Sequence, residues 1–397
     1  MSAVRVAHVT TIPATVSVLL MHQLQAIRDA GFEVLAVSGP GPETRELERA
    51  GIRHYALPSL NRRYDPLSDL RALVDLVGLF RRERFTIVHT HMPKTGVLGR
   101  LAARAAGVPI IVNTVHGLYG IEHDHGFRRW LFLTLERLAA GVSDFELCQS
   151  REIFELFCDL AIFRDGRASH LGNGIDLAYF TPAAVDPMAV ARLRREFSIP
   201  PEAPVVGTVG RLTSDKGYQE FFVAQARVCA RYPRVVFIAC GTAYDRDTLP
   251  TAAVERARAN GVRFLGFRSD MREVYALMDL FVLPSHREGF PRAAMEAAAM
   301  GKALVLSDIR GCREVVTHGQ NGMLVPAYQT EPLVQAILKL LAEPELRTRY
   351  GEASRRRALT EFDERKVFER VLATYGALLT LRERRSRPWF RRSAEPG

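Results

Sequence analysis

Between positions 285 and 301 the chain reads Ser285-His286-Arg287-Glu288-Gly289-Phe290-Pro291-Arg292-Ala293-Ala294-Met295-Glu296-Ala297-Ala298-Ala299-Met300-Gly301. The apolar run Leu280 to Leu283 precedes this stretch and predicts a buried strand. Pro291 suits the first position of a helix, where its missing N–H needs no partner, and Gly301 suits the C-terminal cap. The stretch therefore predicts a loop that holds Glu288 and a helix that holds Glu296 about one and a half turns from its start.

This junction has the chemistry of a site for a phosphorylated sugar. Unpaired N–H groups and the helix dipole both favour anions at a helix N-terminus. A phosphate bound there would leave Glu288 and Glu296 on either side, where carboxylates can accept hydrogen bonds from hydroxyls. The pattern indicates a nucleotide-sugar site, with a sugar ring at the loop glutamate and a ribose at the helix glutamate. The alternative is a surface helix that carries two solvated glutamates.

Strand-like and helix-like segments alternate along nearly the whole chain, which is the pattern of a parallel α/β sheet. The alternation breaks near Tyr179 and restarts after the proline-rich segment Ile199 to Pro204. We therefore predict two Rossmann-like domains that face a central cleft, over residues 1–183 and 184–362. Residues 363–397 are predicted to form a long helix, over Asp363 to Arg384, with a basic tail. The predicted strands are 4–9, 33–38, 86–89, 110–114 and 144–149 in the first half, and 205–209, 235–239, 262–265, 280–283 and 303–306 in the second.

The composition is that of a folded, basic protein. Hydrophobic residues make up 47% of the 397 residues, which is enough for a sizeable core. The five cysteines include no C-x-x-C pair, which argues against a disulfide framework or a zinc ribbon and favours a reducing compartment. The first residues predict a strand rather than a signal peptide, and no apolar run approaches the ~20 residues that span a bilayer. The net charge of +10 indicates an acidic partner without identifying it.

Further segments follow one another in the order found in a known family. They are Asn113-Thr-Val-His116-Gly117, Leu171-Gly-Asn-Gly-Ile-Asp176, Gly207 to Gly217, Ser307 to Val316 and Asn321 to Pro326. Together with the stretch 285–301, this set resembles the retaining GT-B glycosyltransferases of glycosyltransferase family 4, over about residues 85 to 326. The loop Thr10 to Thr15 departs from the family, because many relatives carry a Gly-Gly pair there. The departure and the run His89 to Arg100 resemble the subgroup that makes bacterial surface polysaccharides.

The resemblance implies a GT-B fold whose C-terminal helix crosses back to the N-terminal domain, and a donor site in the C-terminal half. Arg211 and Lys216, after the predicted strand 205–209, are implied to hold the diphosphate and to stabilise its charge as the sugar bond breaks. Glu296 is implied to accept hydrogen bonds from the ribose, and Glu288 to contact the donor sugar. Further donor contacts are expected from Gly289 and Phe290 and, as a base-binding edge, from Gly266, Phe267 and Arg268.

On the N-terminal side, His116 follows a predicted strand and is implied to approach the sugar and the reaction centre, where a neutral imidazole can donate to a hydroxyl. The alternative is a packed strand-end histidine. The predicted catalytic set is thus His116, Arg211, Lys216 and Glu288. Lys94 is a predicted contact to an acceptor phosphate, and His123 is assigned to the acceptor side.

No metal and no cofactor are expected. His89, His91 and the histidines around position 123 have the composition of a metal cluster, but GT-B enzymes usually neutralise phosphates with Arg and Lys instead. Retaining transfer could use a carboxylate nucleophile. The resemblance implies instead a front-face displacement, in which a phosphate oxygen takes the acceptor proton and Glu288 is not the nucleophile. The sequence leaves both routes open.

The expected function is transfer of a hexose or N-acetylhexosamine, with retention, from a nucleotide-diphosphate sugar to a lipid-linked saccharide or polysaccharide precursor, with a uridine-linked donor favoured. The rivals are a nucleotide-sugar 2-epimerase on the same fold and a non-enzymatic scaffold that binds membrane or nucleic acid. Basic and aromatic residues interleave at Arg62 to Tyr64, Phe80 to Arg82, Phe127 to Phe132 and in the tail. These segments favour an anionic membrane surface over nucleic acid as a partner. The predicted location is cytoplasmic, at the inner face of the cell membrane.

Overall fold

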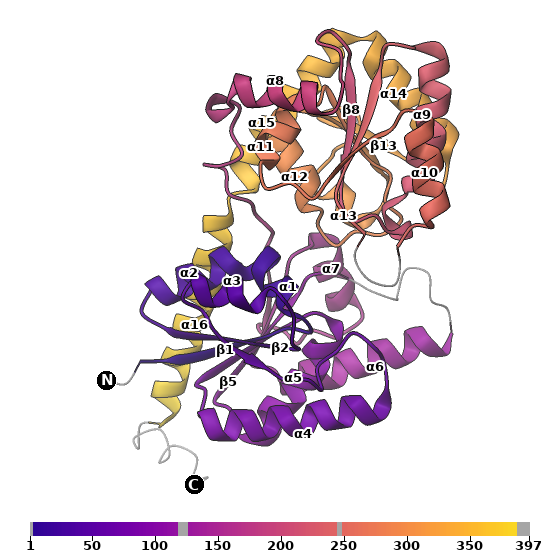
Figure 1. Ribbon diagram of the computed structural model, residues 1–397. Helices are drawn as coiled ribbons and strands as arrows, with labels where there is room; N and C mark the ends of the chain where they lie inside the picture. The colour runs from indigo at the N-terminus through magenta and orange to yellow at the C-terminus, as the bar shows by residue number, and fades with distance from the viewer. Residues whose placement is uncertain (1–2, 118–125, 244–247, 387–397) are drawn as a thin grey trace. The chain divides into compact units, whose positions relative to one another are not determined.

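The chain forms two compact units, which the computed structural model describes over residues 3–117, 126–243 and 248–386 (Figure 1). The first unit comprises Met1–Gly172 and Arg365–Gly397, and the second comprises Asn173–Glu364. The C-terminal helix thus returns to the N-terminal unit. Residues 173–183, which the sequence placed in the first domain, lie in the second unit. The reason is packing: Ile175 pairs with Asp363, and Ile175 and Phe180 are buried in the core of the second unit.

The first unit is built on a seven-stranded sheet with the order β3-β2-β1-β4-β5-β6-β7 and parallel pairing throughout. In such doubly wound sheets, ligands bind outside the carboxyl ends of the strands, where the strand order reverses. That point lies between β1 and β4. The strands are β1 (Arg5–Val9), β2 (Glu33–Ser38), β3 (Arg53–Ala56), β4 (Ile87–His91), β5 (Ile110–Val115), β6 (Phe145–Cys148) and β7 (Ala168–His170).

Helices cover the two faces of this sheet and bury separate apolar clusters against it. The C-terminal helix α16 (Glu364–Ser386) contributes Val367, Val371 and Tyr375 to one of these clusters. The other helices are α1 (Pro13–Thr15), the π-helical turn η1 (Val16–Leu20), α2 (Met21–Asp29), α3 (Thr44–Arg49), α4 (Pro66–Glu83), α5 (Pro93–Ala106), α6 (Phe127–Val142) and α7 (Arg151–Asp159).

The second unit repeats this plan on a six-stranded sheet with the order β10-β9-β8-β11-β12-β13, again with parallel pairing. Its strand order reverses between β8 and β11. The strands are β8 (Val205–Val209), β9 (Val236–Cys240), β10 (Arg263–Gly266), β11 (Leu280–Leu283), β12 (Ala303–Ser307) and β13 (Gly322–Val325). The helices are η2 (Pro182–Ala184), α8 (Pro187–Glu196), η3 (Ser214–Lys216), α9 (Tyr218–Arg231), α10 (Thr251–Ala259), α11 (Met271–Leu277), α12 (Arg292–Ala299), α13 (Arg310–Arg313), α14 (Thr330–Ala342) and α15 (Pro344–Glu361).

The predicted pair of Rossmann-like domains is confirmed, and each strand that the sequence missed lies at the edge of its sheet. Central strands such as β11 are buried on both faces and read as unbroken apolar runs, which made them easy to predict. The edge strand β3 has exposed ends and a sequence, RHYA, that lacks any apolar run. The edge strands β7 and β13 were also missed, as were the helices α7, α13, α14 and α15. Among the described residues, no helix combines the length and the apolar character needed to cross a membrane.

Candidate active site

Two loops meet at the carboxyl edge of the second sheet. One joins β8 to α9 and the other joins β11 to α12, and β8 and β11 are neighbours in the sheet. The backbone N–H of His286 donates to the carbonyl of Asp215 at 2.8 Å. Gly217 has φ +68°, and a Cβ at this position would lie 1.9 Å from the carbonyl oxygen of Pro284. Glycine is therefore required for the two loops to pack this closely.

This packing brings together Lys216 and Glu288, which the sequence assigned to one site from separate motifs. The Lys216 Nζ donates to Glu288 Oε1 at 2.6 Å, and the Ser285 hydroxyl donates to the same oxygen at 2.8 Å. Both charged side chains are largely buried. Burial opposes the charge of Lys216, but the Glu288 carboxylate outweighs it, so the pKa of Lys216 is raised. Lys216 is thus a fixed cation held by an internal counterion.

Arg211 differs from Lys216 in being accessible. Its side chain is 47% exposed and lies 3.7 Å from the Asp215 carboxylate. Burial acts to raise the pKa of Asp215, but a hydrogen bond from Thr213 and the cations Lys216 and Arg211 outweigh it, so the pKa is lowered. Asp215 therefore stays ionised and orients the guanidinium. The two cations predicted for the diphosphate lie on the same short loop.

Glu296 lies on α12, one residue earlier in its helix than predicted, because Pro291 is the N-cap and Arg292 the first helical residue. The Tyr275 hydroxyl donates to Glu296 Oε2 at 2.7 Å, and Arg292 Nε lies 3.9 Å from Oε1. Burial raises the pKa of Glu296, although Arg292 and Tyr275 act in the opposite direction. The helix ends as predicted: Gly301 has φ +70°, and its N–H donates to the carbonyl of Ala298.

The remaining predicted donor residues fall on two loops. Gly289 and Phe290 continue the β11–α12 loop, and the Phe290 carbonyl accepts a hydrogen bond from Asn173 at 3.2 Å. Gly266 ends β10, and the Phe267 side chain that follows is 79% exposed. Arg268 is already engaged: it makes two hydrogen bonds to Asp270, at 2.8 and 2.7 Å, and a third to Glu196 at 2.9 Å. Arg268 is therefore paired within its own unit.

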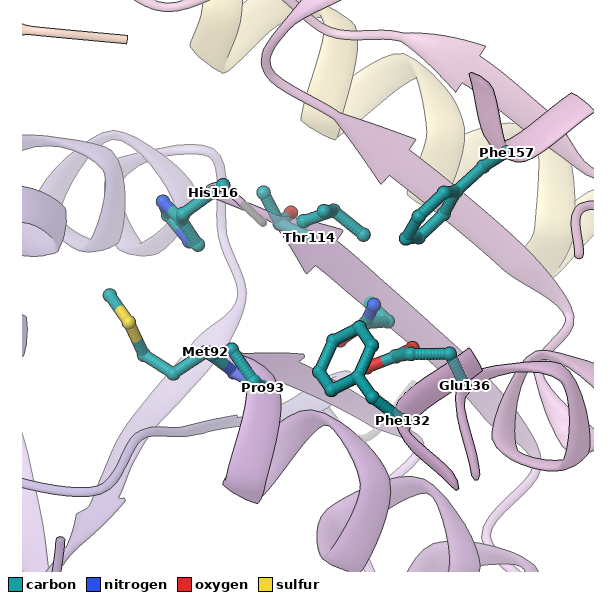
Figure 2. Close-up of a pocket in the computed structure, with 10 residues that line it drawn as sticks. Met92, Pro93, Thr114, His116, Phe132, Glu136 and Phe157 are labelled. Atoms are coloured by element: carbon teal, nitrogen blue, oxygen red, sulfur yellow. The ribbon is translucent and has the colours of Figure 1, made fainter. Parts of the chain in front are cut away.

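In the first unit, His116 lies at the carboxyl end of β5 and lines a pocket (Figure 2). Met92, before α5, lines the same pocket and adopts φ +65°, which non-glycine residues rarely do. Its lining combines the apolar side chains of Phe132 and Phe157 with the polar groups of Glu136 and Thr114, and Phe132 lies beside Glu136 on α6 (Figure 2). The full lining is Met92, Pro93, Asn113, Thr114, Val115, His116, Gly117, Phe132, Glu136 and Phe157.

Sequence reasoning missed a buried ion network that includes two residues of the pocket lining, Glu136 and Asn113. Arg100 is fully buried and donates to Glu136 at 2.5 Å and to Glu146 at 2.8 Å. Asn113 donates to Glu146 at 2.8 Å. Burial raises the pKa of Glu136, although the Arg100 charge opposes this. Arg100 ends the run His89 to Arg100 that carries part of the family resemblance, but its carboxylate partners lie on other elements, α6 and β6.

The structure also assembles a buried group of histidines at the switch point of the first sheet. His8 of β1 and His89 and His91 of β4 are fully buried, and His91 bonds to His116 at 2.9 Å. Sequence reasoning missed His8, although a polar residue inside the apolar strand β1 was a usable signal. Ligand atoms of His8, His89 and His91 lie within 4.8 Å of one another, which a metal ion could bridge. The expected absence of a metal thus stays a prediction.

The two predicted acceptor-side residues have different outcomes. Lys94 is buried near the start of α5, where its Nζ donates to the carbonyl of Arg63 and lies 2.5 Å from Asp69 Oδ1. Its charge is therefore already balanced by a carboxylate. His123 lies outside the described residues.

Family models match both halves of the chain. The model described as "Glycosyl transferase 4-like domain" matches residues 15–174, and the model described as "Glycosyl transferases group 1" matches residues 190–357. Among solved structures, the Anabaena protein Alr3699/HepE in complex with UDP superposes with a TM-score of 0.77 at 20% identity, over 94% of this chain and all of that one. Sucrose-phosphate synthase from Thermosynechococcus elongatus superposes with a TM-score of 0.80 at 20% identity, over 95% of this chain.

Curated relatives match over most of their length. The Escherichia coli UDP-Gal:alpha-D-GlcNAc-diphosphoundecaprenol alpha-1,3-galactosyltransferase is 29% identical over 85% of this chain and 88% of its own. The Campylobacter jejuni N,N'-diacetylbacillosaminyl-diphospho-undecaprenol alpha-1,3-N-acetylgalactosaminyltransferase is 26% identical over 90% of this chain and 94% of its own. With two Rossmann-like units, a family model for each and relatives of this kind, the chain belongs to the GT-B glycosyltransferases of the family 4 type.

Proposed function

We propose that this glycosyltransferase moves a hexose or N-acetylhexosamine from a UDP-sugar to a lipid-linked saccharide, with retention of the anomeric configuration. The observation that carries the proposal is the pairing of Lys216 with Glu288 beside Arg211, at the switch point of the second sheet. The named activities of the relatives support the choice of donor and acceptor: one uses UDP-galactose, and both act on sugars linked to diphospho-undecaprenol.

The proposed role of each residue in the site follows from its charge. Arg211 and Lys216 bind the diphosphate and stabilise the negative charge that grows on it as the sugar leaves. When the phosphates approach Lys216, Glu288 remains within reach of a sugar hydroxyl while Ser285 still holds one of its oxygens. Glu296, fixed by Tyr275, accepts hydrogen bonds from the ribose. His116 serves the N-terminal side of the reaction.

The proposed chemistry is a front-face displacement. The acceptor hydroxyl oxygen forms a bond to the anomeric carbon as the bond from that carbon to the phosphate oxygen breaks. The hydroxyl proton passes to a phosphate oxygen of the departing UDP, so the products are the glycoside and UDP. No side chain has to act as base or nucleophile, and we expect transfer to continue in the presence of a metal chelator.

The first test is transfer from radiolabelled UDP-galactose and UDP-N-acetylgalactosamine to a GlcNAc-diphosphate lipid. Lys216→Ala is expected to lower kcat about 10²- to 10³-fold, the usual effect of removing one transition-state charge partner. The matched control is Arg227→Ala on α9, which removes an exposed cation paired with Glu331 and should leave the rate unchanged. Full activity in Lys216→Ala would refute the assigned site.

Substitution of Glu288 distinguishes the two retaining routes, which are a front-face displacement and attack by a carboxylate nucleophile. If Glu288 only contacts sugar, Glu288→Gln keeps a hydrogen-bonding group and is expected to lower kcat about tenfold. A nucleophile would instead lose all turnover and, in the wild type, leave a glycosyl adduct on Glu288 that mass spectrometry detects. Incubating donor without acceptor tests the epimerase rival, because an epimerase would interconvert the UDP-sugars.

Exposed apolar side chains on two helices of the first unit support a membrane-bound, lipid-linked acceptor. Helix α5 contacts both α4 and α6, and each of these two helices exposes apolar side chains next to arginines such as Arg71 and Arg128. Such faces adsorb to anionic leaflets by combining apolar burial with charge attraction. The exposed apolar residues are Leu67, Leu70 and Val74 on α4, and Phe127, Trp130, Leu131, Leu135 and Leu138 on α6.

Vesicle binding tests this surface. The chain has two tryptophans, so Trp389→Phe leaves Trp130 as the single reporter. Its emission is expected to shift to the blue with phosphatidylglycerol vesicles and to remain unchanged with phosphatidylcholine vesicles. A spectrum unchanged by both would contradict the membrane assignment of α6 and leave the catalytic proposal untouched.

A further inference from the structure

A continuous chain of hydrogen bonds joins the C-terminal helix to His116. The Tyr375 hydroxyl of α16 lies 3.3 Å from His8 Nε2 and 2.6 Å from His89 Nδ1. His8 Nδ1 lies 3.0 Å from His91 Nε2, and His91 Nδ1 lies 2.9 Å from His116 Nε2. At the other end, His89 Nε2 lies 2.7 Å from the Thr114 hydroxyl. The chain thus runs from Thr114 to His116, two residues that line the same pocket.

The rings in this chain are uncharged. Burial lowers the pKa of His8 to about 3 and that of His116 to about 4, with a Gln149 hydrogen bond partly opposing the effect on His116. Burial, reinforced by the neighbouring rings, lowers the pKa of His89 and His91 well below the usual range. A neutral imidazole has one N–H donor and one lone-pair acceptor. Each ring therefore donates a hydrogen bond from one nitrogen and accepts one at the other. It cannot donate from both nitrogens or accept at both.

This restriction correlates the four rings. Every bond between two histidines joins Nδ1 of one ring to Nε2 of the next, and Tyr375 joins Nε2 of His8 to Nδ1 of His89. If one ring carries its proton on Nε2, the next must do the same, since two donors or two lone pairs cannot face each other. Thr114 and Gln149 can donate or accept, so both ends of the chain allow either arrangement. His8, His91 and His116 therefore share one tautomer, with their protons all on Nδ1 or all on Nε2, and His89 shares it when the Tyr375 hydroxyl donates to one of its two rings and accepts from the other.

The ring geometry favours this chain over a metal site. His8 and His91 lie 5.2 Å apart between centroids with planes at 15°, while their nitrogens are 3.0 Å apart, so the rings meet edge to edge. His89 stacks on His91 at 4.4 Å and turns its two nitrogens to Tyr375 and Thr114. A metal needs lone pairs that converge on one point, whereas these nitrogens already point at one another or at hydroxyls.

We propose that Tyr375 is a positioning residue whose hydroxyl, through His8 and His91, couples the tautomer of His116 to that of His89. The tautomer decides whether His116 offers a donor or an acceptor to a hydroxyl that takes the place of its hydrogen-bond partner Gln149. This consequence for transfer rests on the proposed function, but the coupling of the rings does not.

The coupling is tested without substrate by nitrogen NMR of protein labelled at its 11 histidines. Signals are assigned by substituting each ring in turn. The four rings are expected to show one common tautomer in the wild type. Tyr375→Phe removes the hydroxyl and keeps the ring, so His8, His91 and His116 should give a second set of signals or a shifted average. Tyr55→Phe is the matched control. It removes a hydroxyl that bonds to Glu83 and takes no part in the hydrogen bonds among these histidines, so it should change none of the three histidine signals.

Three results would overturn the proposal: different tautomers among the four rings, an unchanged His116 in Tyr375→Phe, or a stoichiometric metal ion in the purified protein. His8→Phe keeps ring volume and breaks the path between Tyr375 and His91. It is expected to shift His116 in the same way, and it decides the matter if Tyr375→Phe fails to fold.

Measurements of kcat and KM distinguish a positioning role of Tyr375 from a loss of structure. Tyr375→Phe is expected to lower kcat for transfer about tenfold, the scale of one hydrogen bond, with KM for the donor unchanged. An unchanged kcat together with shifted His116 signals would mean that the tautomer has no role in transfer, and would overturn that half of the proposal. If the wild type transfers no sugar at all, the proposed function fails and the NMR result still stands.

Discussion

Residues of one chemical type have different roles here because their partners differ. Arg211 is half exposed beside a single carboxylate, whereas Arg268 is held by Asp270 and Glu196 and Arg100 is buried between Glu136 and Glu146. Of these three arginines, Arg211 alone can bind a ligand without breaking an ion pair of good geometry. The sequence could name Arg211 and Arg268 as cations near strand ends, but it could not say which one was already neutralised.

Glu296 gives a pH prediction. Its pKa in the folded state is raised, chiefly by burial, so the folded protein binds this proton more tightly than the unfolded chain does. Stability is therefore lost as pH rises from the ordinary carboxyl range through the raised value. Glu296→Gln removes that loss, so the variant's melting temperature relative to wild type should rise between pH 4 and pH 8.

The same substitution should weaken UDP binding about tenfold, because hydrogen bonds from the ribose to a charged carboxylate are stronger than those to an amide. Thermal unfolding at several pH values and titration calorimetry with UDP measure the two effects. A melting-temperature difference that does not change with pH would contradict the assigned ionisation of Glu296. Arg227→Ala, remote from this carboxyl group, serves as the control.

Among the elements, the loops at strand ends depend on close backbone approach. The β8–α9 and β11–α12 loops pack so that Gly217 meets the carbonyl of Pro284. Gly319, in a loop of the same unit, has a similar φ of +78°, but a Cβ there would meet nothing within 4 Å. At both positions the positive φ would strain any residue with a side chain. At Gly217 a side chain would also clash with a backbone oxygen.

This pair predicts two different costs for one substitution. Gly319→Ala should lower the free energy of unfolding by about 1 kcal/mol, the cost of placing a side chain at positive φ. Gly217→Ala should cost more than about 3 kcal/mol or displace the loop, because a Cβ cannot share space with a backbone oxygen. Urea denaturation measures the difference. Equal losses would show that the loop moves aside without strain, and UDP affinity would then report whether Lys216 moved with it.

On the scale of the whole molecule, the C-terminal helix is part of the first unit's core. Val371 and Tyr375 are fully buried against residues of the first sheet and its helices, although the whole second unit separates them from these residues in sequence. The first unit is therefore not complete until α16 has been made. The second unit, Asn173–Glu364, is continuous in sequence.

Ending the chain after Glu364 should unfold the first unit selectively. Its core would lose α16, while the second unit would keep all of its own elements. Hydrogen exchange with mass spectrometry is expected to show lost protection in β1, β4 and β5 and retained protection in β8 and β11, which serve as the internal control. Full protection of the first sheet would show that α16 contributes little to its stability.

The sequence by itself determined the parts of this protein that rest on local pattern. Buried strands such as Leu280–Leu283 read as apolar runs, and Gly301 marked the end of α12, because strand burial and helix capping involve residues close in sequence. Motifs that follow such strands placed Arg211, Lys216, Glu288 and Glu296 at one edge of a sheet, since the carboxyl ends of parallel strands meet there. The edge strands and the π-turn at Val16–Leu20 lacked a comparable signal.

Only the tertiary structure decided which of these groups touch. The ion pair of Lys216 with Glu288 joins positions 72 residues apart, and the bond of His89 to Tyr375 joins positions 286 apart. No periodicity links residues at such separations, because they meet only when sheet order and helix packing are set. The same holds for the charge of each group, since burial and partners, rather than residue type, determine its pKa.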